Sequence, residues 1–440
     1  MKSKLVKYLG ISLLVLLSLV LTAYIALTIY LNSQTDQHFD EIFDQKDTIS
    51  ENHHDSTKVM IDSVETQIIR VSHRNALAEP SGFDPNAGKN IRRIFNGRRI
   101  NIAVIGVDSR LGDHYKHADA NHVLSIIIDS SAIEITSIPR DTYADCGYHD
   151  STNQNKITVM YAAKGRDEYL KEIASIADLD KIHYYIEVGF SQSMGIMELL
   201  GHKDSKKTLQ VLRSRSALGG DDFQRVYNQG QFIRQSILKH FHEVEGFWGD
   251  VMLKGGVSIV NTNISYPTAK NIVEKLSNRG FPRDSSSVYV RVRPPMPLRY
   301  KIFDFNDDEV ITSLSDTLDR YNISHGIKDT TVNPRTKIDL TEKLWYRLQE
   351  AALDTGSKDY RVIQKLRTHF DQRCWLQVPL KEERNAIRDE FALLLSTAYL
   401  NQGKKEKAAK ILRIVENEKN LFNNNSFQTI NNLQLPDTLH

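Results

Sequence analysis

The chain has 440 residues, which is too long for one ordinary hydrophobic core and indicates two or three folded units. Its 57 Lys and Arg residues nearly balance 55 Asp and Glu residues, for a formal net charge of +2, so no overall field draws the chain to nucleic acid. Any anion site must therefore be local. The two cysteines, Cys146 and Cys374, match no zinc or CxxC spacing, which favours two unrelated thiols over one disulfide.

The amino terminus carries an uncharged run rich in Leu, Ile and Val, from Leu9 to Leu31. As a helix this run would extend roughly 35 Å, which is enough to cross a bilayer. Three lysines precede it and acidic residues follow it, so the positive-inside rule predicts a cytoplasmic tail at residues 1–8 and exports the rest. A cleaved signal peptide is the alternative, but the run exceeds an ordinary signal core and no clean cleavage site follows. We expect a single-pass anchor in the cell membrane, followed by a polar spacer over residues 32–97.

Strand and helix patterns alternate over residues 98–325. Continuous apolar runs predict strands at residues 101–107, 123–129, 133–138 and 183–188. Helical periodicity predicts helices at residues 167–177, 191–200 and 223–244. The second of these helices would begin with Ser191 as its N-cap. Because only a short link at Ser130 and Ser131 joins the second and third strands, they form a hairpin and the sheet is not purely parallel. These patterns predict an α/β domain that the stretch from Val257 to Pro294 completes.

The pattern becomes all-helical over residues 326–440, with periodic Leu, Ala and Phe positions and few strand signals. The run from Phe391 to Leu412 places apolar residues on two helices around a turn at residues 401–403, which is similar to one tetratricopeptide-type hairpin. One hairpin does not make a repeat array. Packing against the preceding domain and binding of a protein partner both remain open for this region.

Two carboxylates lie where predicted strands meet polar loops. Asp108 directly follows the strand at residues 101–107, and Asp119 lies eleven residues later, just before the next strand. Both can therefore converge at one edge of the sheet. Two carboxylate ligands suit Mg²⁺ or Mn²⁺, which take their other ligands from water and substrate phosphate. Capping of turns by the two carboxylates is the alternative.

Arginines gather near these carboxylates. Arg140 follows the strand at residues 133–138, and Arg213 and Arg215 alternate along a segment that we predict to be extended. Arg110 lies two residues after Asp108. Guanidinium groups bind phosphate oxygens bidentately, so this set indicates a pyrophosphate that carries its own metal. A network of surface ion pairs is the alternative, and the position at strand ends favours the phosphate site.

A glycine pair at residues 219–220 precedes Asp221 and the predicted helix that carries Asp222 and Arg225. A helix start offers free backbone amides to an anion, and an Asp there can also act only as the N-cap. Asp222 is a candidate general base and Arg225 a candidate phosphate ligand. Capping by Asp221 or Asp222 remains the alternative.

The order of these motifs resembles the LytR-CpsA-Psr family, whose members transfer glycopolymers from polyprenyl-pyrophosphate lipids to the cell wall. The resemblance covers about residues 98–325. The motifs that carry it are IGVDSR at 105–110, HADA at 117–120, SIPRDTY at 137–143, LRSR at 212–215 and DFQR at 222–225. Further family landmarks are similar to KITVMYAAKG at 156–165, YYIEVGF at 184–190 and TNIS at 262–265. The resemblance implies an α/β fold with a mixed, largely antiparallel central sheet flanked by helices.

The resemblance also implies roles for these residues. Asp108 and Asp119 would hold Mg²⁺ or Mn²⁺. The pyrophosphate would contact five arginines, namely Arg110, Arg140, Arg213, Arg215 and Arg225. Catalysis would rest on Arg140, Asp222 and Arg225, with Asp222 activating a sugar hydroxyl, although Asp141 and Asp221 are further candidates for the base. An apolar tunnel between sheet and helices would take the polyprenyl tail, and ordinary core packing is the alternative for each of its candidate residues, Ile186, Val188, Phe190, Met194 and Met197.

Two positions depart from the family pattern. The second motif usually has an arginine immediately before Ser-Asp, whereas this chain has His117 and Ala118 before Asp119, and Asn228 stands where the closing helix usually repeats an arginine. Both changes remove positive charge.

The implied partners are a polyprenyl-pyrophosphate-linked glycan, peptidoglycan or another envelope acceptor, and the membrane. Besides the phosphotransferase, two alternatives remain: a polyprenyl-pyrophosphate hydrolase, and a non-catalytic, lipid-binding envelope scaffold whose helical tail recruits a protein partner.

Overall fold

The protein is described here by a computed structural model. It places residues 82–84, 86–89, 99–108, 111–113, 116–215, 218, 221–245, 249–326 and 339–423, and the backbone alone of residues 67–70, 91–94 and 246–248. The expected membrane anchor and Arg110 lie outside these residues. Within the described residues, no helix has both the length and the apolar composition that a membrane span requires.

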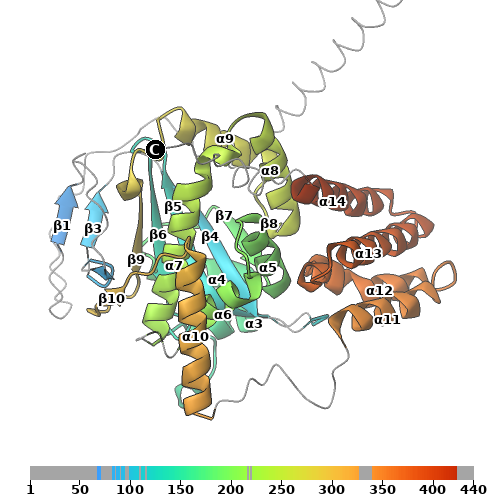
Figure 1. The fold of residues 1–440 in the computed structure, drawn as a ribbon, viewed down its shortest axis with the longest axis horizontal. Helices are drawn as coiled ribbons and strands as arrows, with labels where there is room; N and C mark the ends of the chain where they lie inside the picture. The colour runs from blue at the N-terminus through green and yellow to red at the C-terminus, as the bar shows by residue number, and fades with distance from the viewer. Residues whose placement is uncertain are drawn as a thin grey trace, which may run out of the picture.

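The α/β unit is built on a six-stranded sheet with the strand order β8-β7-β4-β5-β6-β9 (Figure 1). In chain order the strands are β4 (Arg99–Asp108), β5 (His117–Ile127), β6 (Ala132–Ile138), β7 (Tyr184–Val188), β8 (Asn261–Thr262) and β9 (Val288–Val292). The pairs β4–β5, β5–β6 and β7–β8 are antiparallel, and β4–β7 and β6–β9 are parallel. The prediction of a mixed sheet flanked by helices is therefore confirmed, and the hairpin turns at Ser131, whose φ is 49°.

Helices cover both faces of this sheet because side chains alternate along its strands. On one face, α3 (Ile157–Lys164) and α4 (Arg166–Ile176) pack against a core that includes Ala103 and Ile105 of β4. On the opposite face, α7 (Asp222–His240) packs against a core that includes Ile100 and Ile102 of the same strand (Figure 1). The other helices of the unit are α5 (Phe190–Leu199), α6 (Ser205–Arg213), α8 (Gly246–Ile259), α9 (Tyr266–Ser277) and α10 (Asp308–Ser324).

Two local predictions are wrong. The N-cap of α5 is Gly189, not Ser191, because the helix begins at Phe190 and the Gly189 amide donates to Gln192 Oε1 at 2.7 Å, which is one of the two hydrogen bonds of a capping box. Arg213 does not lie in an extended segment but ends α6, whose apolar face buries Leu209 and Leu212. Amphipathic burial of this short helix outweighs the alternating Arg and Ser pattern that suggested a strand.

Residues 82–84 and 86–89 pack on the α/β unit, although the sequence placed them in a spacer. Strand β2 (Phe83–Asp84) pairs with β10 (Tyr300–Lys301), and Tyr227 Oη donates to Asp84 Oδ2 at 2.9 Å. Ala87 is 1% exposed and its carbonyl accepts from the Val292 amide. These residues therefore belong with the edge of the sheet. Further toward the amino terminus, β1 (Gln67–Arg70) and β3 (Ile91–Ile94) form a separate parallel pair.

The carboxy-terminal helices form a second unit with its own core (Figure 1). They are α11 (Leu340–Ala352), α12 (Asp359–Asp371), α13 (Lys381–Asn401) and α14 (Lys405–Asn423). Helix α14 packs on α8, where Leu421 lies against Gly255. The helical unit thus packs against the α/β unit, as one of the two open interpretations expected. Cys146 and Cys374 are both buried and free, which confirms two unrelated thiols.

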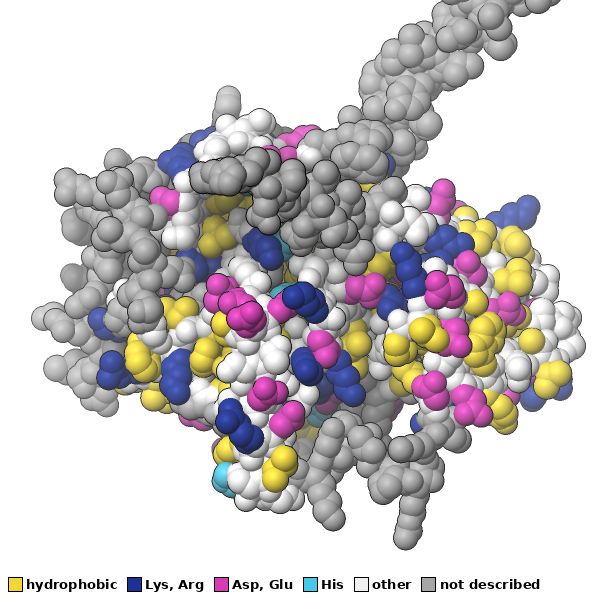
Figure 2. All heavy atoms as spheres, viewed as in Figure 1, with side chains coloured by type: hydrophobic (Ala, Val, Ile, Leu, Met, Phe, Trp, Pro, Cys, Tyr) yellow, Lys and Arg dark blue, Asp and Glu magenta, His cyan; other side chains and the backbone are white. Residues whose placement is uncertain are grey.

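Polar contacts fasten the two units together. Arg384 Nη1 of the helical unit bonds Glu198 Oε2 at 2.6 Å, and Gln377 Nε2 donates to Ser191 Oγ at 2.7 Å. Away from this interface, apolar side chains are spread over the surface of the helical unit (Figure 2). Its exposed large apolar residues include Tyr346, Leu353, Tyr360, Leu380, Leu393, Leu400 and Leu412.

The loop between β4 and β5 is held by the helical unit. The Gly112 amide donates to Gln372 Oε1 at 2.8 Å, and Gln372 Nε2 donates to the Asp113 carbonyl at 3.3 Å. Gly112 has a φ of +80°, and a Cβ atom there would lie 2.5 Å from His369 Cε1. Glycine is therefore needed both for the backbone conformation and for the close approach of α12.

Candidate functional site

The candidate site lies where β4 ends and β5 begins. Asp108, the last residue of β4, pairs with His117, and Asp119 follows two residues along β5. The pairing register shifts between Gly106 and Val107, so a β-bulge bends the strands at this point. Asp108 and Asp119 line the same cavity, which confirms the expectation that they converge at one edge of the sheet.

Arg140 and Arg225 hold Asp119 from two sides. Arg140 Nη1 lies 2.6 Å from Asp119 Oδ1, and Thr158 Oγ1 donates to the same oxygen at 3.3 Å. Arg225 Nη2 donates to the Asp119 backbone carbonyl at 3.3 Å. In the described part of the chain nothing donates to the second carboxylate oxygen of Asp119. That oxygen can therefore face a cation or a substrate.

Asp222 joins Arg140 and Arg225 into one cluster. Its Oδ2 accepts from the Arg140 amide at 3.0 Å, and its Oδ1 lies 2.5 Å from Arg225 Nη2. Burial raises the pKa of the Asp222 carboxyl above its ordinary value, and the Arg225 guanidinium partly offsets this effect. Burial likewise lowers the pKa of the Arg225 guanidinium. Both charges are thus held in a poorly solvated place.

The sequence left open whether Asp221 or Asp222 caps α7, and the hydrogen bonds at the start of the helix show which one does. Asp221 is the N-cap, and its side chain accepts from the Phe223 amide at 2.9 Å. Asp222, the first residue of the helix, therefore keeps its carboxylate for the cluster. Asp141 instead pairs with Lys156 at 3.3 Å and is largely exposed. Of the three candidate bases, Asp222 alone contacts both Arg140 and Arg225.

The remaining predicted residues form an exposed outer group. Asp108 and Arg213 are 58% and 47% exposed at their side chains and lie 3.8 Å apart. The Arg213 guanidinium also lies over the Phe190 ring, 5.4 Å from its centroid. Arg215 Nε lies 3.7 Å from Asp222 Oδ1, which links the outer group to the buried cluster. Arg110 lies outside the described residues.

An apolar cavity of about 240 Å³ opens behind these charges. Of the predicted tunnel residues, Val188, Phe190 and Met197 line it, and Ile186 and Met194 do not. Ile186 packs into the core beneath α7 instead. The other apolar walls come mainly from α6 and α7 and include Leu209, Leu212, Phe232 and Ile233. Asp108, Asp119, Arg213 and Arg225 also line this cavity, so charged groups and apolar walls share one space.

His122 is a cavity residue that the sequence did not single out. It is buried in β5, with Nδ1 2.9 Å from Ser137 Oγ and Nε2 3.3 Å from Gln229 Oε1. Burial lowers its pKa to about 4, and the nearby Arg225 charge acts in the same direction. The imidazole is therefore neutral near pH 7. A lone His within the apolar run of β5 was the available signal.

The two departures from the family pattern occupy different places. His117 lies at the start of β5, opposite Asp108. Asn228 is 2% exposed, and its side-chain oxygen accepts from Gln224 Nε2 at 2.8 Å. Gln224 in turn bonds the Lys301 backbone, so Asn228 takes part in a buried amide network between α7 and β10.

The chain is similar to one family model and to several solved structures. Residues 59–201 match the family model described as the LytR_cpsA_psr family. A search of curated proteins found no match. Solved structures with similarity include TagV of B. subtilis, at 17% identity over 50% of this chain and 97% of that chain, with a TM-score of 0.36.

Two further solved structures show comparable similarity. A transcriptional regulator from Enterococcus faecalis is 16% identical over 50% of this chain and 88% of that chain, with a TM-score of 0.35. TagT, solved bound to LIIa-WTA, is 18% identical over 50% of this chain and 91% of that chain, with a TM-score of 0.33. The resemblance indicated by the ordered motifs is confirmed by the family model, and residues 59–201 mark this chain as similar to the LytR-CpsA-Psr family.

Proposed function

We propose that this protein is a membrane-anchored phosphotransferase that moves a glycopolymer from a polyprenyl-pyrophosphate carrier to a cell-wall acceptor outside the cytoplasm. One observation carries the proposal: the cluster of Asp119, Arg140, Asp222 and Arg225 adjoins an apolar cavity. The donor would be amphipathic in the same way, with a doubly charged pyrophosphate next to a hydrocarbon chain. The family match supports this assignment.

The arginines would bind the pyrophosphate and stabilise the charge that develops on it. Arg140 and Arg225 are already oriented by carboxylates and backbone groups, so they need little reorganisation when a phosphate arrives. Arg213 and Arg215 are more exposed and can close over the outer phosphate oxygens. Guanidinium groups suit this role because each offers several N–H donors in one plane.

The apolar cavity would take the first part of the polyprenyl chain. Phe190, Met197 and Phe232 line it, and burying hydrocarbon there gives about 25 cal/mol for each Å² removed from water. A cavity of about 240 Å³ holds a few isoprene units, so the rest of a long chain would extend beyond it. An extended chain is compatible with a protein anchored at the membrane.

A Mg²⁺ or Mn²⁺ ion fits the two acidic residues at this site. Asp108 is exposed, Asp119 has one oxygen without a protein donor, and both line the cavity. One or two carboxylates with substrate phosphate and water are an ordinary ligand set for these ions. Such an ion would supply neutralisation of the pyrophosphate charge. In the described residues no group of three or more His, Cys, Asp or Glu side chains gathers to hold a metal.

Asp222 would act as the general base. Its raised pKa makes the carboxylate a better proton acceptor than an ordinary surface Asp. The acceptor hydroxyl oxygen would attack the phosphorus that carries the glycan, and its proton would pass to Asp222. The bond between that phosphorus and the bridging oxygen would break, and polyprenyl phosphate would leave. No nucleotide is needed, because the pyrophosphate bond drives the transfer.

The test uses the full chain in detergent micelles, a short-chain polyprenyl-pyrophosphate glycan, Mg²⁺ and peptidoglycan fragments. Glycan attachment and release of polyprenyl phosphate are measured together. Arg140→Gln should lower the rate of attachment by about a hundredfold, because one preorganised donor to the developing charge is lost. Arg279→Gln is the matched control, since Arg279 pairs with Asp129 at 2.9 Å on the surface and does not line the cavity.

Each result separates the proposal from its alternatives. Metal-dependent attachment that Arg140→Gln loses and Arg279→Gln keeps supports the transferase. Release of polyprenyl phosphate without attachment indicates the hydrolase. Binding of the lipid without either product indicates a non-catalytic scaffold, and the transferase proposal then fails.

A further inference from the structure

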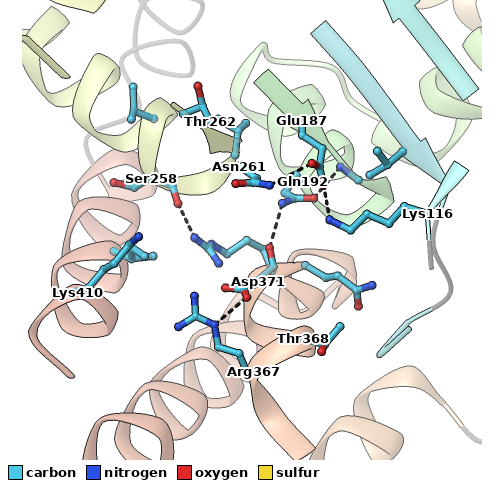
Figure 3. Close-up of a pocket in the computed structure, with 17 residues that line it drawn as sticks. Lys116, Glu187, Gln192, Ser258, Asn261, Thr262, Arg367, Thr368, Asp371 and Lys410 are labelled. Carbon is cyan, nitrogen blue, oxygen red and sulfur yellow. Dashed lines mark hydrogen bonds and ion pairs between the residues drawn. The ribbon is translucent and has the colours of Figure 1, made fainter. Parts of the chain in front are cut away.

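A second and larger cavity, of about 440 Å³, lies between the α/β unit and the helical unit (Figure 3). One wall comes from the ends of β4 and β7, from α5 and from the α8–β8 segment. The other wall comes from α12, the residues that follow it, and α14. Neither unit alone forms this space, so the cavity exists only because the two units are docked.

The cavity has an excess of positive charge. Four of its lining residues are cationic, Lys116, Arg367, Arg373 and Lys410, and two are carboxylates, Glu187 and Asp371. Lys116 forms an ion pair with Glu187, and Arg367 Nε bonds Asp371 Oδ2 at 2.7 Å. Both carboxylates are therefore already paired. Two positive charges in the lining, those of Arg373 and Lys410, remain without a carboxylate from the lining.

Arg373 is an unusual member of this lining. The residue is 4% exposed, yet its hydrogen bonds go to neutral carbonyls, those of Phe370 at 2.5 Å and Ser258 at 2.7 Å. Its Nε has no hydrogen-bond partner. A buried guanidinium without a bonded carboxylate is costly, since its desolvation is not repaid by an ion pair. Glu418 and Asp371 offset part of this charge at longer range, and the remainder favours an anion in the adjoining space.

Lys410 and Arg367 can contact such an anion directly. Lys410 is exposed on α14 and forms no ion pair within the described part of the chain, and Figure 3 shows it on the same side of the cavity as Arg367. Arg367 uses Nε for Asp371 and has only a long contact of Nη1 with Tyr399 Oη, at 3.5 Å. Its guanidinium therefore keeps donors for a ligand.

The facing wall offers neutral hydrogen-bonding groups. Gln192, Ser258, Asn261 and Thr262 line it (Figure 3). Gln192 already accepts from the Gly189 amide at 2.7 Å and donates to the Asp371 carbonyl at 3.1 Å, and the Ser258 and Thr262 hydroxyls also have protein partners. The Asn261 amide donates to Glu187 Oε2 at 3.1 Å, and within the described residues its side-chain oxygen accepts no hydrogen bond. No aromatic side chain is among the lining residues, so a nucleobase would have no ring on which to stack. Cations opposite a polar wall without aromatic rings instead suit a ligand that has hydroxyl groups and one anionic group. The volume is within the usual range for a small-molecule site, about 300–1,000 Å³.

We infer that this interdomain cavity binds an anionic saccharide, with its carboxylate or phosphate at Lys410 and Arg367 and a hydroxyl at Asn261 on the facing wall. The cavity lies next to the candidate catalytic site. Val107 and Gly189 line both cavities, so the two are neighbours separated by the start of α5. Resting on the proposed function, the saccharide in this cavity is the acceptor of the transfer.

The test measures binding by isothermal titration calorimetry with the full chain in detergent micelles. The probes are a digalacturonate, glucose 6-phosphate, and the neutral disaccharide lactose. Digalacturonate or glucose 6-phosphate should bind about tenfold more tightly than lactose, and the difference should shrink as salt screens the exposed Lys410. Which of the two binds more tightly distinguishes a carboxylate ligand from a phosphate ligand.

Lys410→Glu reverses one charge of the cavity, and Lys407→Glu is its matched control. Lys407 is exposed on the same helix, one turn away, and does not line the cavity. Lys410→Glu should weaken binding of the anionic probe about tenfold, and Lys407→Glu should change it less than about twofold. Equal losses in both variants, equal affinity for charged and neutral probes, or no binding of any probe would overturn the inference.

The inference and the proposed function fail in different experiments. Arg140→Gln should lower the rate of transfer about a hundredfold and leave the affinity for the saccharide probe unchanged. Lys410→Glu should raise the KM for the acceptor in the transfer assay and leave donor binding unchanged. Saccharide binding by a protein that never transfers would retain the inference and remove the proposed function, whereas transfer with no saccharide binding would do the reverse.

Discussion

The charged residues of the candidate site form two groups that differ in burial. Asp222 and Arg225 are 14% and 5% exposed and lie 2.5 Å apart, and they share contacts with Asp119 and Arg140. Asp108 and Arg213 are about half exposed and lie 3.8 Å apart. The inner group is thus fixed before any ligand binds, and the outer group is free to rearrange.

This difference separates two tasks that the sequence could not distinguish. A preorganised inner group can stabilise developing charge without reorganisation during the reaction. Exposed charges are screened by water and salt, so the outer group contributes little until a metal ion or phosphate displaces solvent. Substitutions in the two groups should therefore differ in their effects on stability as well as on activity.

The largest effect is expected for Arg225→Gln. This change leaves the Asp222 carboxylate buried without its cation, so the free energy of unfolding should fall by roughly 4 kcal/mol, as measured by urea denaturation followed by circular dichroism. The double variant Asp222→Asn with Arg225→Gln should recover most of that loss. A double variant no more stable than Arg225→Gln alone would show that the ion pair is not what makes the inner group stable.

A somewhat smaller loss of stability is expected when acid protonates His122, which lines the same cavity as Arg225 of the inner group. Its folded pKa of about 4 lies below the ordinary value, so the unfolded chain binds a proton at a higher pH than the folded chain does. Stability is therefore retained above pH ~6.5 and lost as the pH falls toward ~4, by about 3 kcal/mol in total. His122→Gln should remove this part of the pH dependence when unfolding is compared at pH 7 and pH 4.5. An unchanged pH dependence would contradict the buried, neutral imidazole.

Asp222 gives a prediction about rate. As a base with a raised pKa it must be deprotonated, so kcat/KM should fall on the acid side at a pH above that of an ordinary carboxyl. Asp222→Asn should lower kcat about a hundredfold and abolish that acid limb. Asp221→Asn is the control, because an Asn can keep the N-cap. Persistence of the limb in Asp222→Asn would assign the base to another group.

The smallest change in stability is expected for the outer group. Asp108→Asn and Arg213→Gln should each alter the free energy of unfolding by less than about 0.5 kcal/mol, because the pair is exposed and its partners lie 3.8 Å apart. Asp108→Asn should nevertheless raise the Mg²⁺ concentration needed for half-maximal transfer. A loss of stability as large as that of Arg225→Gln would erase the distinction between the two groups.

The sheet and the inner group were largely within reach of sequence reasoning. Apolar runs such as residues 101–107 and 133–138 are short and rich in β-branched residues, which favours buried strands over helices, and the polar residues that follow a strand lie at the sheet edge. Arg140 of the inner group and Asp108 of the outer group were found in this way. The start of α7 was harder, because two adjacent aspartates at 221 and 222 have the same local pattern. Only the hydrogen bond from Phe223 shows which one is the cap.

Features that depend on distant contacts were not predictable. His122 is marked in the sequence only as a lone histidine within an apolar run, and its role depends on Gln229, which lies 107 residues away. The cavity walls from α6 and α7 are ordinary amphipathic faces until both helices are placed over the sheet. The interdomain cavity is lined by residues from both units, such as Glu187 and Asp371, and no local sequence pattern predicts that these residues come together.

The contact between Gly112 and Gln372 also has a consequence for the order in which the protein is made. These residues are 260 positions apart, and Gln372 holds the loop that joins Asp108 to Asp119. On the ribosome that hydrogen bond cannot form until most of the chain has been synthesised. The sheet can assemble earlier from residues 99–292, but Gly112 in the loop between Asp108 and Asp119 gains this contact only when the helical unit has been made. Maturation of the site is therefore coupled to completion of the chain.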